Sequence, residues 1–425
     1  MKKKSSLTAR VMVGLVAGIL IGLAVNRMDP GFLRDQLLVG GLFNFMGQIF
    51  LRLIMMLVPP LVAVSIANGV AGMNDIGKLG RVGARTLVYY ALTTLVSCMI
   101  GLALGLFFKP GAGLDLASLQ ASAPQVAANT SAARNVWDTL LQLVPTNPFN
   151  ALSTGNMLQI IVFSLFIGVG IAVLGEKTRR LAGALNELND VLMHLIGVVM
   201  ELAPYGVFGF MARTMGSLGF NALLPLARYV GVFYLGLALW GVFVAGGLLA
   251  SHGLSPFTYL RKFGKVMALS FSTASSNATL PLNMAVTTEQ LGASGRIAAF
   301  TLPLGATVNM NGTALMQGVA ALFVAQIYGV TLLPSQLFFV VLTATLSAVG
   351  TAGVPGAGTV MLSMVLASVG LPLEGVGLVF AVDRIIDMGR TTANITGDSI
   401  CTLLICKAEG EFNKEVFLSA EKPLE

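Results

Sequence analysis

Near its C-terminus the chain reads AVDRIIDMGRTTANITGDS, from Ala381 to Ser399. This stretch holds three aspartates and two arginines, whereas residues 297–373 hold no charged residue. In a helix each residue advances by about 100°, so five polar or charged side chains share one side of it. They are Asp383, Asp387, Arg390, Asn394 and Asp398. Ionisable groups in apolar surroundings are costly and normally pair or mark a substrate or ion path, so we predict a buried polar seam here.

The composition of the whole chain is that of a membrane protein. Of its 425 residues 55% are hydrophobic and 11% are charged, and the mean hydropathy is +0.83. A soluble domain carries about a quarter charged residues. Together with repeated apolar runs of about 20 residues, this predicts an all-α polytopic membrane protein in the lipid bilayer. The net charge of +7 sits in short basic clusters between the apolar runs, so it does not indicate a nucleic-acid partner.

Six apolar stretches predict membrane spans in the first 250 residues. They are Val11–Val25, Leu42–Ala71, Thr86–Phe108, Pro148–Leu174, Leu181–Met211 and Tyr229–Ala250. Basic clusters precede the first span and follow the second, fourth and sixth, so all lie on one side, which the positive-inside tendency makes cytoplasmic. The clusters are Lys2–Lys4 with Arg10, Lys78–Arg85, Lys177–Arg180 and Arg261–Lys265. We therefore expect a multi-pass protein of the inner (plasma) membrane with both termini in the cytoplasm and an external loop at residues 111–133.

Two later stretches do not resemble lipid-facing helices. Ala268–Asn283 is rich in Ser, Thr and Asn, and Leu346–Val360 carries four glycines and a proline. Backbone of this kind is tolerated in a membrane only where it is buried in protein or lines a polar cavity. We predict two helical hairpins that turn back inside the membrane from opposite faces, a feature that marks the binding site of many transporters. Two ordinary spans with short loops are the alternative.

Leu302–Met316, LPLGATVNMNGTALM, combines helix breakers with oxygen-bearing side chains. The breakers are Pro303, Gly305 and Gly312, and the oxygen-bearing side chains are Thr307, Asn309, Asn311 and Thr313. Asn394 and Asp398 have no basic partner nearby in the sequence, and oxygen ligands of this type suit a hard cation such as sodium. The alternatives are a kinked packing helix here and, in the seam, aspartates that merely neutralise Arg384 and Arg390.

Four motifs, in this order and spacing, resemble the glutamate transporter family, also called dicarboxylate/amino acid:cation symporters. They are SSNATLP (275–281), LPLGATVNMNGTA (302–314), GTAGVPGAG (350–358) and DMGRTTANITGD (387–398). The resemblance covers nearly the whole chain. It implies eight transmembrane helices plus two opposed re-entrant helical hairpins, an elevator-type mechanism and a homotrimer.

The resemblance also implies a division of the chain. Residues 1–85 would hold spans one and two of a fixed scaffold, and 86–110 span three of a moving transport domain. Residues 111–225 would hold the external loop and scaffold spans four and five. Residues 226–410 would complete the transport domain with span six, the first hairpin, span seven, the second hairpin and span eight. Residues 411–425 would be a cytoplasmic tail.

The resemblance further assigns roles to individual residues. Arg390 corresponds to the arginine that grips the side-chain carboxylate of an acidic amino acid, and Asp387 to the aspartate that accepts its amino group. The other implied substrate contacts are Ser276, Thr313, Gly353, Val354, Thr391 and Asn394. No cofactor is implied beyond sodium as the coupling ion. The first implied sodium site uses Asp398, Asn394, Gly305 and Asn309; the second Thr307, Ala348, Val349 and Thr351; the third Tyr90, Thr93, Thr94, Asn309 and Asn311.

Two positions depart from the family's pattern. The family's Asn-Met-Asp-Gly-Thr appears here with Asn311 in place of the aspartate. This removes a negative charge from the third cation site, so we expect that site to be weakened or empty, or the ion stoichiometry to differ. Ala274 stands where archaeal relatives carry an arginine, and Arg384 is expected to supply the missing positive charge.

The sequence therefore predicts a secondary transporter, not an enzyme, that imports L-aspartate or L-glutamate with sodium. The alternatives within the class are a proton-coupled glutamate carrier, a C4-dicarboxylate carrier and a neutral amino acid exchanger. Arg390 disfavours a neutral substrate and Asp387 disfavours a plain dicarboxylate, because each would leave a buried charge unpaired. An anion channel is the alternative from a different class. An enzyme is disfavoured because the only histidines, His194 and His252, lie outside the motifs.

Overall fold

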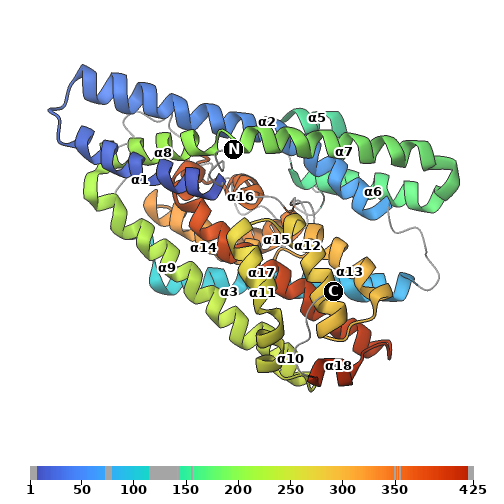
Figure 1. The fold of residues 1–425 in the computed structure, drawn as a ribbon. Coiled ribbons are helices and arrows are strands. Elements are labelled where there is room, and N and C mark those ends of the chain that lie inside the picture. Colours follow the sequence, from blue (N-terminus) through green and yellow to red (C-terminus); the bar gives the residue numbers. More distant parts are fainter. Residues whose placement is uncertain are drawn as a thin grey trace, which may run out of the picture.

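The computed structural model describes residues 7–71, 79–113, 141, 144–154, 157–348, 351, 353 and 356–419. Every regular element in this part of the chain is a helix, which confirms the prediction of an all-α protein. Figure 1 shows a long upper layer that contains α1, α2, α5, α6, α7 and α8, with most of the other helices gathered beneath it.

The upper layer is built from residues 7–71 and 148–222. Its elements are α1 (Leu7–Asn26), η1 (Phe32–Phe43), α2 (Asn44–Ala71), α5 (Pro148–Thr154), α6 (Met157–Leu174), η4 (Gly175–Thr178), α7 (Arg179–Met200), α8 (Ala203–Leu218) and η5 (Gly219–Ala222). Within this layer α1 packs on α8, and α2 packs on α6, α7 and α8.

The lower body holds α3 and most of the C-terminal half. Its elements are α3 (Leu79–Phe108), α9 (Leu223–Leu239), η6 (Trp240–Gly246), α10 (Gly247–Ser251), α11 (Pro256–Thr273), α12 (Ser276–Ala285), η7 (Val286–Gln290), α13 (Gly295–Val308), α14 (Asn311–Ile327), α15 (Pro334–Ala348), α16 (Ala357–Ser368), α17 (Gly375–Ala408) and α18 (Lys414–Leu418). The central helix is α17, which contacts α11, α13, α14 and α16 of this body and α8 of the upper layer.

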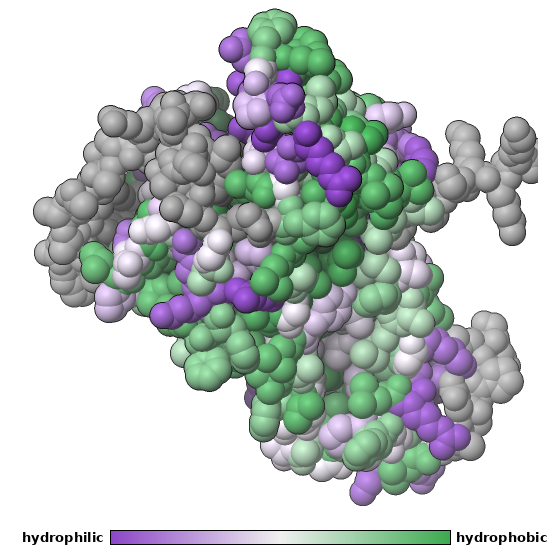
Figure 2. Space-filling view, turned by 90° about the vertical axis from the view of Figure 1, so that its left-hand side faces the viewer, coloured by the Kyte–Doolittle hydropathy of each residue, from purple (hydrophilic) through white to green (hydrophobic). Residues whose placement is uncertain are grey.

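Four helical segments in the described part of the chain are long and apolar enough to cross a membrane. They are Ala9–Asn26, Val82–Phe108, Leu223–Ser251 and Gly295–Ile327. A fifth would be the pair Val162–Val199 and Ala203–Leu218, which is bent by 50°. The side surface turned to the viewer in Figure 2 is largely hydrophobic over the lower body, and large apolar side chains such as Val242 and Phe243 of η6 are exposed.

The structure corrects one predicted span. Leu181–Met211 is not one helix, because α7 ends at Met200 and α8 begins at Ala203, with a proline in the first turn of the new helix, where proline is tolerated. Within the predicted span Pro148–Leu174, residues 155 and 156 lie outside the described residues. The predicted external loop at 111–133 and the basic residues Lys2–Lys4 and Lys78 lie almost wholly outside the described residues.

The first predicted hairpin is a helix–turn–helix unit, the two helices of the second, α15 and α16, pack on each other, and the two tips touch. The first joins α11 to α12 through Ala274, which has a left-handed backbone (φ 51°), and Ser275, whose hydroxyl accepts from the Ala278 N–H and caps α12. The second joins α15 to α16. The Gly353 carbonyl in its tip accepts from Ser275 Oγ (2.9 Å) and from the Asn277 N–H (3.1 Å). Insertion of the two hairpins into the membrane from opposite faces remains a prediction.

The predicted helix interruption within Leu302–Met316 is confirmed, but its predicted position is wrong, because Pro303 and Gly305 lie inside α13 and Gly312 lies inside α14. The helix α13 ends at Val308 and α14 begins at Asn311, and the two intervening residues, Asn309 and Met310, have non-helical backbone angles. This break faces α17, because both α13 and α14 pack on that helix.

Close packing of α3 on α14 fixes the position of the break. A Cβ on Gly101 of α3 would lie 2.2 Å from the Leu315 carbonyl oxygen, and one on Gly318 of α14 would lie 2.7 Å from the Cys98 carbonyl oxygen. Small residues at such contacts let the backbones of membrane helices approach closely.

We expect Gly101→Ala to lower the melting temperature in detergent, because the methyl group must push α3 away from α14, at a cost of about 1–3 kcal/mol. Gly170→Ala on α6 is the matched control, since nothing lies within 4 Å of a Cβ there. The control should leave the melting temperature unchanged or raise it, because alanine favours helix more than glycine does. Equal melting temperatures for the two variants would contradict the close α3–α14 contact.

Candidate functional site

The polar seam of α17 is buried in the protein. Its five residues, Asp383, Asp387, Arg390, Asn394 and Asp398, are each at most 6% exposed. The apolar side of the helix is buried as well, including Ile386 and Ile395. The helix is therefore enclosed on both sides, and its charges depend on protein partners.

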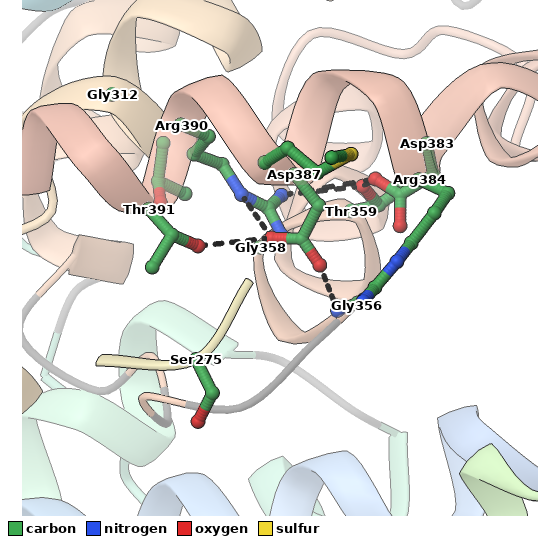
Figure 3. A network of polar contacts seen from close by, with 12 residues as sticks. Ser275, Gly312, Gly356, Gly358, Thr359, Asp383, Arg384, Asp387, Arg390 and Thr391 are labelled. Atoms are coloured by element: carbon green, nitrogen blue, oxygen red, sulfur yellow. Dashed lines mark hydrogen bonds and ion pairs between the residues drawn. The ribbon is translucent and has the colours of Figure 1, made fainter. Parts of the chain in front are cut away.

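Arg390 is held by two aspartates of its own helix and one hydroxyl of the second hairpin (Figure 3). Its Nη2 lies 2.5 Å from Asp387 Oδ1, and its Nε donates to the same oxygen at 3.1 Å. Its Nη1 donates to Thr359 Oγ1 (3.3 Å) and lies 3.9 Å from Asp383 Oδ1. A buried cation of this kind is stable only when such partners surround it.

The start of α16 is bound tightly to this cluster. The Gly356 N–H donates to Asp387 Oδ2 at 2.8 Å, and the Thr359 hydroxyl donates to Asp383. A Cβ on Gly358 would lie 2.3 Å from Arg390 Nη1, so only glycine lets the guanidinium reach the hairpin backbone. The second hairpin therefore closes over Arg390 and Asp387.

Arg384 forms a hydrogen bond to the first hairpin. Its Nη2 donates to the Thr273 carbonyl oxygen at 3.4 Å. Thr273 is the last residue of α11, and cations near a helix C-terminus are favourable because the carbonyls there carry negative partial charge. The guanidinium thus lies beside the tip at Ala274, where the sequence led us to expect it.

Asn394 connects the seam to the first turn of α14. Its Oδ1 accepts from the Gly312 N–H at 2.8 Å, and its Nδ2 donates to Thr313 Oγ1 at 3.3 Å. Thr391, one turn back, donates to Asp387 Oδ1 at 3.4 Å. The predicted contacts Thr313, Asp387, Arg390, Thr391 and Asn394 are therefore brought together in one place.

Two buried oxygens near Asp398 have no hydrogen-bond partner among the described residues. Asn309 Nδ2 donates to Asp398 Oδ1 at 2.7 Å, but Asn309 Oδ1 and Asp398 Oδ2 are unpartnered. A Cβ on Gly305 would lie 2.5 Å from Asp398 Oδ1 and 2.7 Å from the Tyr90 hydroxyl. Buried polar atoms normally have partners, so the donor set of the first predicted cation site fits a hard cation.

In the third predicted cation set, Thr94 and Asn311 are joined by a hydrogen bond. Thr94 Oγ1 donates to Asn311 Oδ1 at 3.2 Å, whereas the Asn311 amide nitrogen is buried without a partner in the described part of the chain. Thr93 donates to the Tyr89 carbonyl of its own helix, and Tyr90 donates to the Thr301 carbonyl. This set offers neutral oxygens and, at Asn311, an amide donor where a carboxylate would attract a cation.

In the second predicted cation set, no hydrogen bond among the described residues joins Thr307 to the other members. Thr307 donates to the Leu304 carbonyl in its own helix, and the Thr351 N–H donates to the Ala348 carbonyl. Val349 of this set, and the predicted substrate contact Val354, lie outside the described residues. Ser276 is buried at the first tip, beside Gly353 of the second.

Comparison with known proteins identifies the family. Residues 7–408 match the model of the Sodium:dicarboxylate symporter family. The chain belongs to this family. It is 36% identical to the "Proton/glutamate-aspartate symporter" of Escherichia coli (strain K12), over 99% of this chain and 96% of the relative. It is 34% identical to the "Proton/sodium-glutamate symport protein" of Bacillus caldotenax, over 97% of both chains, and 32% identical to the "C4-dicarboxylate transport protein" of Bacillus subtilis (strain 168), over 99% and 97%.

Membership of the sodium:dicarboxylate symporter family confirms the resemblance that the four motifs carry. These relatives are named as transporters and not as enzymes, and with the apolar helices this makes the chain an integral membrane transporter. The seam on α17 is then the polar interior that a symporter needs within an apolar body.

Sequence reasoning missed several residues at the site. Thr359 contacts both Arg390 and Asp383, and Gln317 joins the two arms of the second hairpin by accepting from Ser347 Oγ and donating to the Gly358 carbonyl. Gln317 is the one polar residue of α14 beyond its first turn and before Gln326, which is a signal that would have found it. Thr359 follows the glycine-rich tip without any such signal.

Proposed function

We propose that this protein imports L-aspartate or L-glutamate by symport with sodium across the inner (plasma) membrane. The family and the named relatives support a cation-coupled symporter of glutamate or C4-dicarboxylates. The observation that carries the choice of an acidic amino acid is the buried pair of Arg390 and Asp387, 2.5 Å apart, under the second hairpin.

An acidic amino acid has the charges that this pair requires. Its side-chain carboxylate binds the guanidinium of Arg390, whose planar fork suits bidentate binding. Its ammonium group binds the carboxylate of Asp387. Arg390 then exchanges the carboxylate of Asp387 for that of the substrate, and Asp387 exchanges the guanidinium of Arg390 for the substrate's ammonium group. A neutral amino acid would leave Arg390 without an anion, and a plain dicarboxylate would leave Asp387 without a cation, and either outcome is costly in a buried site.

The remaining site residues complete this arrangement. Ser276, Thr313, Thr391 and Asn394, together with the backbones of Gly353 and Val354, contact the substrate. Three sets of oxygens are proposed for sodium, and the third lacks a carboxylate because of Asn311. The first set is Asp398, Asn394, Gly305 and Asn309; the second is Thr307, Ala348, Val349 and Thr351; the third is Tyr90, Thr93, Thr94, Asn309 and Asn311. The unpartnered oxygens of Asn309 and Asp398 support the first set.

The protein works as an elevator, and we assign it eight spans, two opposed re-entrant hairpins, cytoplasmic termini and a homotrimeric assembly. Residues 86–110 and 226–410 form the transport domain, and residues 1–85 and 111–225 form the scaffold. This division is supported by the packing, because α3 contacts α14 and α17 of the lower body while α1 and α2 contact α6, α7 and α8 of the upper layer (Figure 1).

Coupling follows if sodium and substrate order the same hairpin tip. The second hairpin reaches the substrate pair through the Gly356 N–H and the second sodium set through Thr351 and Ala348. When only sodium or only the substrate is bound, this tip stays incompletely ordered and the transport domain does not move. Proton-coupled symport of glutamate or a C4-dicarboxylate is the second candidate, because the relatives' names include both; an anion channel is the alternative from another class.

Uptake into proteoliposomes tests the proposal directly. We expect saturable aspartate or glutamate uptake that an inward sodium gradient drives and a proton gradient alone does not. Asp398→Asn should abolish the sodium dependence, because it removes the charge from the first cation set, while Asp29→Asn, remote in sequence between α1 and η1, should leave uptake unchanged. Flux that ignores sodium would exclude the coupling, and non-saturable flux without counterflow would indicate a channel.

Arg390→Cys tests the substrate assignment. We expect aspartate affinity to fall at least about thirtyfold, since removing one partner of a buried charge pair costs about 2–5 kcal/mol, and binding of neutral amino acids to appear. Isothermal titration with aspartate, glutamate, serine and succinate measures both effects, with exposed Arg228→Cys as the control. Unchanged aspartate affinity in Arg390→Cys would show that the guanidinium does not bind the substrate, and tight succinate binding by the parent protein would favour the dicarboxylate carrier.

Asn311→Asp tests the third cation set. The added carboxylate should strengthen cation binding there, so aspartate affinity should depend more steeply on sodium concentration, by about one ion per protomer. Titration with aspartate at several sodium concentrations gives this slope. Asn413→Asp is the control, because aspartate caps a helix as well as asparagine does and this residue lies in the C-terminal segment. An unchanged slope in Asn311→Asp would mean that the charge at this position does not limit sodium binding.

A further inference from the structure

A buried lysine lies at the base of the first hairpin, the end opposite its tip. Lys262 of α11 belongs to a basic cluster whose neighbour Arg261 is exposed, yet Lys262 itself is only 3% exposed. Burying an ammonium group is costly unless hydrogen bonds satisfy it. The cost indicates that this lysine has a role beyond the orientation of the chain in the membrane.

The ammonium group of Lys262 joins three parts of the chain. It donates to the carbonyl oxygens of Val416 (2.7 Å), Phe417 (2.9 Å) and Gln290 (2.9 Å). An ammonium group has three donors, so these three acceptors match its capacity. Val416 and Phe417 belong to the last residues of α18, where carbonyls lack partners within the helix, and Gln290 ends η7, the continuation of the hairpin's second arm.

The segment from Glu411 to Leu418 is attached to the same region by further contacts. The Asn413 N–H donates to the Gly292 carbonyl at 2.8 Å, and Arg296 pairs with Glu411. A Cβ on Gly292, which has a φ of +78°, would lie 2.2 Å from the Asn413 carbonyl oxygen. Phe417 is 1% exposed, so this segment is packed into the protein and is not a loose tail.

We propose that Lys262 is a positioning residue that clamps the base of the first hairpin through the C-terminal segment, and so keeps this hairpin closed while the second one opens. One ammonium group ties the first arm, α11, to the end of the second arm at Gln290 and to α18. Without this tie, the two arms keep their direct packing, of α11 on α12 and η7, and their contacts with α17, such as those of Tyr259 and Thr287. The transport consequence rests on the proposed function, but the clamp itself does not.

Hydrogen exchange of the purified full-length protein measures the clamp. In Lys262→Met we expect amide exchange across α11, α12 and η7 to quicken by at least about tenfold, the factor expected when a hydrogen bond to a charged group is lost. Exchange in α1 and α8 should stay unchanged. Arg261→Met is the matched control, and Lys262→Arg should restore much of the protection.

Removal of the other half of the clamp should have the same effect. A chain that ends at Gly410 should show the quickened exchange, and one that ends at Ser419 should not. Because both changes remove the contact between Lys262 and α18, the effect of Lys262→Met combined with the Gly410 truncation should be clearly smaller than the sum of the two single effects. Gly292→Ala, which displaces Asn413 without touching Lys262, gives a third route if one variant fails to fold.

The transport readout is the release of preloaded aspartate from proteoliposomes without sodium. It should rise by about the same factor as the exchange, because leak follows the population of the open hairpin, while the aspartate dissociation constant stays within about twofold as long as that population is small. Unchanged exchange in α11–η7, faster exchange throughout the protein, or additive effects in the double variant would overturn the clamp. If the parent protein shows no aspartate transport, the proposed function fails while the exchange data still decide the clamp.

Discussion

The buried guanidinium of Arg390 is the constraint on which the second hairpin depends. At 2% exposure it needs anionic and hydrogen-bonding partners, since an unpaired charge there costs several kcal/mol. Asp383 and Asp387 come from its own helix, and the Thr359 hydroxyl comes from the hairpin. Moving α16 away would leave Thr359 and both carboxylates with fewer partners. The closed position of the hairpin, and with it the contact between the two tips, follows from this requirement.

The broken backbone near the seam also needs hydrogen-bonding partners. Interrupting a helix inside an apolar body frees N–H and C=O groups that must find partners. At the α13–α14 break the Gly312 N–H finds its partner on α17, because it donates to Asn394 Oδ1, and the Asn309 side chain donates to the Asn394 carbonyl. The polar residues of α17 therefore provide partners both for the buried charges and for the broken helix. This explains why the break and the seam lie side by side although about 80 residues of chain separate them.

The sequence predicted these features where the signal is local. Glycines, prolines and clustered hydroxyls indicated the turn at Ala274 and an interruption near Asn309, although the breakers Pro303, Gly305 and Gly312 themselves lie inside helices, and the spacing of charges revealed the seam. The division at Met200 was missed because hydropathy runs on through it and the bend depends on packing. Lys262 was assigned to a solvent-facing basic cluster because its three acceptors lie 28 to 155 residues away. A local sequence pattern cannot indicate partners at that distance. Thr359 was missed for the same reason, because its partners Asp383 and Arg390 are also distant in the sequence.

Under the proposed function, the charges of the seam also constrain how many cations the site holds when substrate is bound. Three buried carboxylates, at Asp383, Asp387 and Asp398, face two guanidinium groups, at Arg384 and Arg390, which leaves one negative charge when all are ionised. An acidic amino acid adds one more. Two monovalent cations then restore neutrality, whereas a third would leave an uncompensated positive charge in an apolar body, which is unfavourable. An aspartate at position 311 would shift this balance by one, so the amide of Asn311 favours a smaller number of bound cations than a carboxylate would.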